Sequence, residues 1–236
     1  MERIKSGIEG LDPLLGGGYP KGKGVLLTGP TGSGKTIFGI HFLHSNCASG
    51  KKGLLVLTRT RLDDLLQQAS CLGLDLDPFI NSGQLLVDNV FESRLKEAQN
   101  ASRLGKGLEL VEKDRIGTVK KLSLDVDVVV YDSLAALSKS WNCVGEEPLK
   151  KFDPLYNVLA DYGCTSLFLM DDRAHKNMQG FADYLVFGKI ELYYKEARQK
   201  GKLDRFMRVS KMRGMELFLD SVGFSITSEG VRIENL

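Results

Sequence analysis

Cysteine is scarce in this sequence. The 236 residues include only Cys47, Cys71, Cys143 and Cys164, with no pair at metal-ligand spacing. A structural zinc site or a disulfide framework needs closely spaced or regularly paired cysteines, so we exclude both as the organising feature of the fold. The sequence predicts instead that the cysteines are small buried hydrophobic residues in a reducing compartment.

Long hydrophobic runs are also missing. No apolar stretch approaches the roughly 20 residues that a membrane helix needs, and residues 1–5 contain no apolar signal core. The formal net charge of +2, from 32 basic and 30 acidic residues, argues neither for nor against a polyanionic partner. Because no proline-rich linker, low-complexity segment or internal repeat divides the chain, we expect a cytoplasmic protein with one domain over residues 1–236.

Glycine, by contrast, is plentiful, and one glycine-rich stretch carries the strongest motif. The phosphate-loop pattern is filled at every position by Gly29, Pro30, Thr31, Gly32, Ser33, Gly34, Lys35 and Thr36. An apolar run precedes it and helical apolar spacing follows it, so strand, turn and helix stand in the required order. Glycines let the backbone curl so that several N–H groups face phosphate oxygens, and the helix N-terminus adds its dipole. This stretch predicts a nucleoside triphosphate site.

The polar side chains of the loop have distinct expected roles. Lys35 is expected to reach the β- and γ-phosphates, and the Thr36 hydroxyl to hold Mg²⁺. The predicted site extends to Ile37, in the first turn of the helix that follows.

Hydrophobic patterning alternates strands and helices before it changes near residue 186. Buried strands are predicted at 25–28, 53–58, 84–88, 126–131 and 165–170, and helices after the loop and at 60–72, 91–121 and 147–162. Thr60 is expected to be the N-cap of the helix at 60–72. Strands without intervening helices then follow at 186–196, 204–213, 224–227 and 231–235. This order indicates an α/β fold with a mainly parallel sheet, flanked by helices, and an antiparallel C-terminal extension.

Further motifs lie along almost the whole chain. They are Ser6-Gly7 with Asp12, GGYPKG at 17–22 with its middle residues Gly18-Tyr19-Pro20, LGLDL at 72–76, VVVYDS at 128–133, KMRG at 211–214, and the segment 224–233. Together with the phosphate loop they resemble the KaiC branch of the RecA/RadA superfamily of ATPases. The resemblance implies a RecA-like P-loop core of the single-domain type found in archaea and bacteria, with Mg-ATP bound at the loop.

The resemblance also implies roles outside the loop. Asp132 ends the strand that looks like Walker B, which implies a carboxylate linked to Mg²⁺, although a helix-capping role fits the position too. Lys211 and Arg213 alternate onto one face of a strand, and in KaiC-like proteins this finger reaches the nucleotide of the neighbouring subunit. The implied assembly is a homo-oligomer with nucleotide near the subunit interfaces. The alternative is two ordinary solvated residues of an edge strand.

One position departs from the family pattern. KaiC-like proteins that hydrolyse ATP resemble one another in two adjacent glutamates after the second strand, where this chain has Arg59 and Thr60. A guanidinium stays protonated, and losing a positioned base commonly costs roughly 10²–10⁴-fold in rate. Phosphate binding should not suffer, because the loop supplies those contacts. Asp171 and Asp172 end a neighbouring strand at the edge of the sheet where ligands bind, so one of them could replace the missing base.

Two other features have plain alternatives. Basic residues between 195 and 213 suit single-stranded DNA, which RecA relatives bind, but aromatic residues for base stacking are limited to Tyr193, Tyr194 and Phe206. We therefore favour a solvated hairpin. His41 and His44 share a helix face without further ligands nearby, which favours ordinary side chains over a metal site.

The leading hypothesis is an ATP-binding regulator or sensor with weak or absent hydrolysis and an unknown protein partner. The first alternative is an active Mg-dependent ATPase in which Lys35 and Asp132 act with Asp171, Asp172 or a residue from a neighbouring subunit. A RadA-like DNA-binding recombinase paralogue is the second alternative.

Overall fold

The computed structural model describes residues 1–90, 92, 125–134, 147–172, 176–196, 201–216 and 220–234. Apart from residue 92, the predicted helix at 91–121 lies outside these ranges. The described helices are α1 (Leu11–Leu14), α2 (Lys35–Ala48), α3 (Leu62–Cys71), α4 (Asp77–Asn81), α8 (Glu147–Asp161) and α9 (Lys176–Leu185). None of these described helices is long and apolar enough to cross a bilayer.

A nine-stranded sheet forms the centre of the molecule, in the order β11-β10-β9-β8-β3-β7-β6-β4-β5. Its strands are β3 (Gly24–Gly29), β4 (Gly53–Leu57), β5 (Leu85–Asn89), β6 (Val128–Asp132), β7 (Thr165–Asp171), β8 (Gly188–Glu196), β9 (Leu203–Met212), β10 (Val222–Thr227) and β11 (Gly230–Ile233). The strands from β5 to β8 in this order are parallel, and β8 through β11 are antiparallel. The predicted fold class, a mainly parallel sheet with an antiparallel C-terminal extension, is confirmed.

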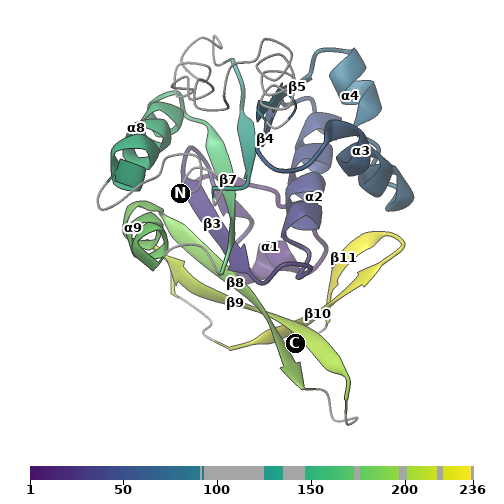
Figure 1. Cartoon of the computed structure of the whole chain (residues 1–236), viewed down its shortest axis with the longest axis vertical. Coiled ribbons are helices and arrows are strands. Elements are labelled where there is room, and N and C mark those ends of the chain that lie inside the picture. Colours follow the sequence, from purple (N-terminus) through teal and green to yellow (C-terminus); the bar gives the residue numbers. More distant parts are fainter. Residues whose placement is uncertain are drawn as a thin grey trace, which may run out of the picture.

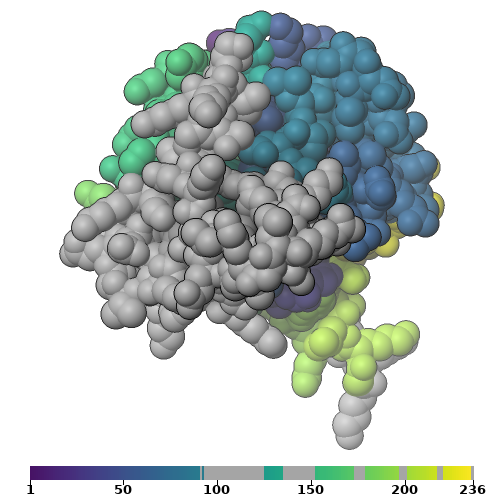
Figure 2. Space-filling view, turned by 45° about the horizontal axis from the view of Figure 1, so that its top comes forward, coloured from purple at the N-terminus to yellow at the C-terminus, as the bar shows by residue number. Residues whose placement is uncertain are grey.

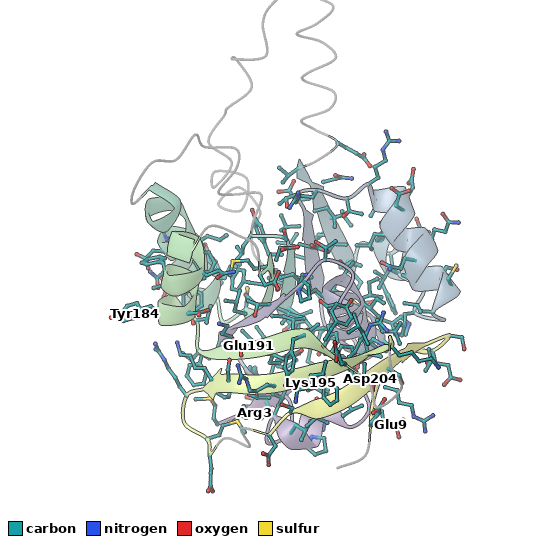
Figure 3. The ribbon with its side chains drawn as sticks, turned by 60° about the horizontal axis from the view of Figure 1, so that its bottom comes forward. Arg3, Glu9, Tyr184, Glu191, Lys195 and Asp204 are labelled. Carbon is teal, nitrogen blue, oxygen red and sulfur yellow. The ribbon has the colours of Figure 1, made fainter. Side chains whose placement is uncertain are left out.

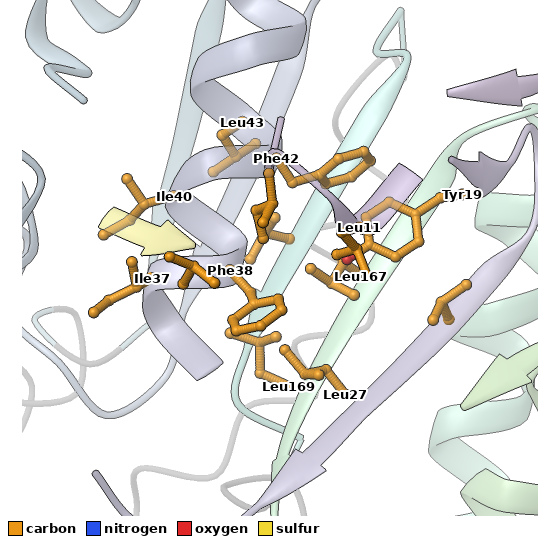
Figure 4. Close-up of a cluster of buried hydrophobic side chains, with 14 of the residues drawn as sticks. Leu11, Tyr19, Leu27, Ile37, Phe38, Ile40, Phe42, Leu43, Leu167 and Leu169 are labelled. Carbon is orange, nitrogen blue, oxygen red and sulfur yellow. The ribbon is translucent and has the colours of Figure 1, made fainter. Parts of the chain in front are cut away.

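Helices cover both faces of the parallel part of the sheet. Figure 1 shows α2, α3 and α4 on one side and α8 and α9 on the other. Successive strand residues face opposite layers, so Leu27 belongs to the core under α2 while Leu26 belongs to the core under α8. Figure 4 shows Phe38 and Ile40 of α2 within the first of these cores. This burial fixes α2, and with it the loop that precedes it, on the sheet.

The antiparallel strands extend the sheet past the helical layers. In Figure 2, α3 and α4 gather on one flank, and the end of the β8–β9 hairpin projects from the body. Lys195 of β8 pairs with Asp204 of β9 near that end, as Figure 3 shows. The extension therefore begins at β8, directly beside β3.

Several local predictions need correction or addition. Arg61, in an extended conformation, is the N-cap of α3 in place of Thr60, and the Leu62 N–H is met by the carboxylate of Glu92. Cys47 and Cys164 are buried as predicted, but Cys71 is exposed at the end of α3, and Cys143 lies outside the described residues. Helices α4 and α9 were not predicted. Nor was the small antiparallel sheet of β1 (Arg3–Ile4) and β2 (Tyr19–Pro20).

Candidate nucleotide-binding site

The phosphate loop runs from the end of β3 to the start of α2 and is packed closely against the sheet extension. Gly32 and Gly34 have φ of +82° and +105°, in the region that favours glycine. A Cβ on Gly34 would lie 2.8 Å from Cδ1 of Ile226 in β10. A Cβ on Gly29 would lie 2.7 Å from the carbonyl oxygen of Leu192 in β8. Gly34 is therefore required by both backbone conformation and space, Gly32 by conformation, and Gly29 by space.

Lys35 is the first residue of α2, and its side chain turns back over the loop. Its Nζ donates to the carbonyl oxygens of Gly29 and Pro30 at 2.7 and 2.8 Å. Burial lowers the pKa of Lys35, and the nearby carboxylates of Asp171, Asp132 and Asp172 oppose that shift. The ammonium group thus lies among carboxylates at the mouth of the loop.

A hydroxyl and a carboxylate meet where Mg²⁺ is expected. Thr36 Oγ1 donates to Oδ2 of Asp132 at 2.7 Å. Burial raises the pKa of the Asp132 carboxyl, and the Thr36 hydrogen bond and the charges of Lys35 and Arg59 oppose the rise. Ser133 N donates to Thr58 Oγ1 at 2.8 Å, which fixes the end of β6 against β4. Two oxygen atoms of the kind that Mg²⁺ prefers are therefore held together at the loop.

The residues present fit a magnesium-bound triphosphate. Curled glycine backbone, a half-buried lysine and a paired hydroxyl and carboxylate are the parts that such a ligand uses. Ser33 Oγ is buried and has no hydrogen-bond partner in the described part of the chain. Ile37 follows the loop with its side chain in the core, and its N–H donates to the Gly34 carbonyl at 2.8 Å.

Arg59 lies just after β4, at the position where the resemblance implies a carboxylate in proteins that hydrolyse ATP. The last residue of β4, Leu57, is aligned with Asp132 in the neighbouring strand β6. Arg59 follows two residues later, is exposed, and lies near enough to Asp132 to favour its ionised form. A cation is therefore present at the carboxyl end of β4, beside the expected metal site.

Asp171 and Asp172 lie at the end of β7, the strand between β3 and β6. Asp171 is aligned with Gly29, and its Oδ2 accepts a hydrogen bond from Thr31 Oγ1 at 2.6 Å. Asp172 donates its backbone N–H to the Gly29 carbonyl at 3.1 Å. The structure thus brings Asp171 into direct contact with the loop, through the hydroxyl of a residue that the motif leaves variable.

Comparison with known proteins places this site in a family. A family model described as the KaiC ATPase matches residues 4–236. The chain belongs to the KaiC ATPase family. It is 29% identical over 240 residues to a UPF0273 protein of Methanopyrus kandleri, covering 99% of this chain and 92% of that protein. It is 27% identical over 242 residues to the circadian clock protein KaiC2 of Synechocystis, covering 98% of this chain and 40% of that protein.

A solved structure shares the fold. The KaiC-like protein of Pyrococcus horikoshii superposes with a TM-score of 0.76 and 24% sequence identity, covering 99% of both chains. The family and the fold together support an ATP-binding, RecA-like P-loop protein.

The two cations that the resemblance assigns to a finger, Lys211 and Arg213, lie against α9 of their own chain. Lys211 Nζ donates to the carbonyl oxygen of Asp183 and, at 3.4 Å, to that of Tyr184. Arg213 Nη2 donates to the Tyr184 carbonyl at 2.8 Å. Burial, followed by the charge of Arg213, lowers the pKa of Lys211. Both cations therefore point to one side of the sheet, as alternation predicted, where the C-terminal end of a helix attracts positive charge.

The outer face of the β8–β9 hairpin is occupied by internal contacts. Lys195 Nζ lies 5.5 Å from the ring centroid of Tyr193 and 4.7 Å from that of Phe206. Arg208 Nε donates to a carboxylate oxygen of Glu191 at 3.1 Å. Such contacts within the hairpin agree with the solvated hairpin that the sequence favoured. Arg198 and Lys200 of the basic stretch lie outside the described residues.

His41, in the middle of α2, makes contacts that hold distant parts of the fold together. Its Nε2 accepts the backbone N–H of Val231 at 2.9 Å, and its Nδ1 lies 3.1 Å from the Gly7 carbonyl oxygen. This pattern requires a neutral ring with the proton on Nδ1. His41 thereby joins the N-terminal segment and β11 to the helix that carries the phosphate loop. His44, one turn further along α2, packs edge-on against Phe79.

Proposed function

We propose that this KaiC-family protein binds Mg-ATP at Gly29–Thr36 and acts as a nucleotide-dependent regulator or sensor with weak or absent hydrolysis. Lys35 would exchange its bonds to the loop carbonyls for phosphate oxygens, and Thr36 and Asp132 would hold the metal. Bound Mg²⁺ would neutralise charge on the β- and γ-phosphates.

Arg59 is the observation that carries the proposal. A protonated guanidinium cannot take a proton from an attacking water, but it can donate hydrogen bonds to phosphate oxygens. Its place beside Asp132 suits retention of the γ-phosphate rather than its release. The bound triphosphate would then persist as a signal state that a partner reads.

An oligomer with nucleotide near its subunit interfaces is part of this proposal. Lys211 and Arg213 lie on one side of the sheet and donate to neutral carbonyl oxygens, which are weaker acceptors than charged phosphate oxygens. In an assembled ring they would contact the nucleotide of a neighbouring copy.

The test is to measure ATP binding and phosphate release on one sample, with Lys35→Ala as the control. Binding that requires Lys35, together with turnover far below that of ordinary ATPases, is the expected result. A turnover rate in the ordinary range of about 1–10³ s⁻¹ would overturn the regulator reading.

The contact between Thr31 and Asp171 favours a second candidate, an active ATPase with a substitute carboxylate. Asp171 lies on the strand between the loop and the Walker B strand, where a carboxylate can approach a water near the γ-phosphate. Turnover that requires both Lys35 and Asp171 would support this candidate.

A further inference from the structure

The strand order predicts which way a bound nucleotide would point along the edge of the sheet. Asp132, the expected metal carboxylate, lies on β6, two strands from β3 on the β7 side. If Thr36 and Asp132 hold the metal that accompanies the phosphates, as proposed above, the terminal phosphate would lie toward β6. The α-phosphate, ribose and base must then lead away from Asp132, toward β8 on the other side of β3. This step rests on the proposed binding of a nucleoside triphosphate.

Tyr194 of β8 lies beside the loop on that side. β8 runs parallel to β3 and continues beyond its end, so Tyr194 lies past the last β3 residue, Gly29. Its hydroxyl oxygen is 3.7 Å from the position that a Cβ on Gly32 would occupy. The tyrosine therefore reaches the tip of the phosphate loop from the side where the base is expected.

Arg205 of β9 accompanies this tyrosine. The two residues are aligned across the hairpin, and the Arg205 guanidinium carbon lies 5.8 Å from the Tyr194 ring centroid. Its Nε is buried and has no hydrogen-bond partner within the described residues. A flat ring and a flat cation with an unused donor thus stand next to each other beside the loop.

The neighbouring tyrosine shows that this arrangement belongs to one face of the strand. Tyr194 shares its face with Ile190 and Leu192, which pack into the core under α2. Tyr193 faces the opposite way, stacks on Phe206 with ring centroids 6.2 Å apart, and bonds to Ser221. Tyr193 thus completes its contacts within the hairpin, on the face that does not reach the loop.

We propose that Tyr194 and Arg205 form the recognition surface for the base of the bound nucleoside triphosphate. Bases stack on tyrosine rings and on guanidinium planes, and such stacking tolerates any base. Arg205 places a positive charge and a second flat surface beside that ring. Phosphate binding and base binding are then carried by separate parts of the chain, the loop and the hairpin.

The experiment compares two ligands, ATP and inorganic tripolyphosphate, by calorimetric titration of the full chain. Tyr194→Ala is expected to weaken ATP binding about tenfold, as loss of a base–aromatic contact does, while tripolyphosphate binding stays unchanged. Tyr194→Phe, which keeps the ring, is expected to recover most of the lost affinity. Tyr193→Ala is the matched control on the other face and is expected to change neither affinity.

The outcomes separate this inference from the proposed function. Equal losses for both ligands in Tyr194→Ala would show a disturbed loop and overturn base recognition, as would no loss for either. A wild-type protein that binds tripolyphosphate and ATP equally would also overturn it. A wild-type protein that binds neither ligand would overturn the proposed function, and this inference with it.

Discussion

The Thr31 hydroxyl donates to Oδ2 of Asp171 at 2.6 Å, which ties the tip of the phosphate loop to the end of β7. Asp171 also contributes to the electrostatic environment of Lys35. The phosphates of a nucleotide in the loop would therefore lie close to a negatively charged carboxylate. Whether that carboxylate assists hydrolysis is open to direct test.

Asp171→Asn removes the charge and the basicity while keeping the shape. If Asp171 is the substitute base, the Lys35-dependent turnover should fall roughly 10²-fold, with ATP affinity preserved or improved. Phosphate release under saturating ATP measures this. Asp172→Asn, one residue away, is the matched control and should leave turnover within about twofold of wild type. Equal effects of the two substitutions would exclude a specific role for Asp171.

Arg59→Glu combined with Thr60→Glu restores the carboxylate pair of the hydrolysing pattern. Because a positioned base commonly contributes 10²–10⁴-fold, we expect turnover to rise by at least about tenfold over wild type. Arg61→Glu makes a similar charge reversal at an exposed residue nearby and should not raise turnover. Unchanged hydrolysis in the double variant would mean that the cation at Arg59 is not what limits the reaction.

Burial of His41 should make the folded protein less stable in mild acid. Burial lowers its pKa below the ordinary value of 6.5, so below that pH the unfolded chain takes up a proton that the folded chain refuses. The free energy of unfolding should therefore fall as the pH drops from about 6.5 toward the lowered folded pKa, by at most about 1.4 kcal/mol per pH unit from this group. Above pH 6.5 the contribution of His41 should be constant.

Urea denaturation of wild type and His41→Gln across pH 5–8 measures this contribution. The glutamine amide can donate and accept but does not titrate, so the variant should lose this part of the pH dependence. If the free energy of unfolding depended on pH in the same way for the two proteins, a buried neutral His41 would be excluded.

Gly230→Ala tests the packing of β11 on α2. A Cβ at this position would lie 2.1 Å from His41 Nε2, at a φ of +92°. Gly50 has a similar φ of +86° with nothing within 4 Å, so Gly50→Ala reports backbone strain alone, about 1–2 kcal/mol. Gly230→Ala should cost a further 1–3 kcal/mol or so, because overpacking forces neighbours to move. Equal losses of unfolding free energy would show that the contact at His41 yields easily.

Local patterns predicted the parts of the site that are continuous in sequence. The phosphate loop, Asp132 at a strand end and the change to consecutive strands near residue 186 all follow from composition and period. The sequence did not predict the short or atypical elements. The strands β1 and β2 have two residues each, and α9 carries Gly180 in its interior, which weakens the helical signal.

Contacts between distant residues were beyond sequence reasoning. Thr31 and Asp171 are 140 positions apart, and no local sequence pattern predicts their hydrogen bond. Tyr194 was counted only among the few aromatic residues of a basic hairpin, because its approach to Gly32 depends on β8 pairing in parallel with β3. The N-cap of α3 is Arg61 rather than Thr60, and the first helical N–H donates to Glu92, which lies 30 residues further along the chain.

The bond between His41 and Val231 joins residues 190 positions apart in the chain. Because the ribosome makes the chain from its N-terminus, the helix behind the phosphate loop is synthesised long before the strand that satisfies its imidazole. Until β11 emerges, the imidazole has no Val231 N–H to accept, and the core around it is open on that side. Closure of the core behind the phosphate loop is thus coupled to the folding of β11.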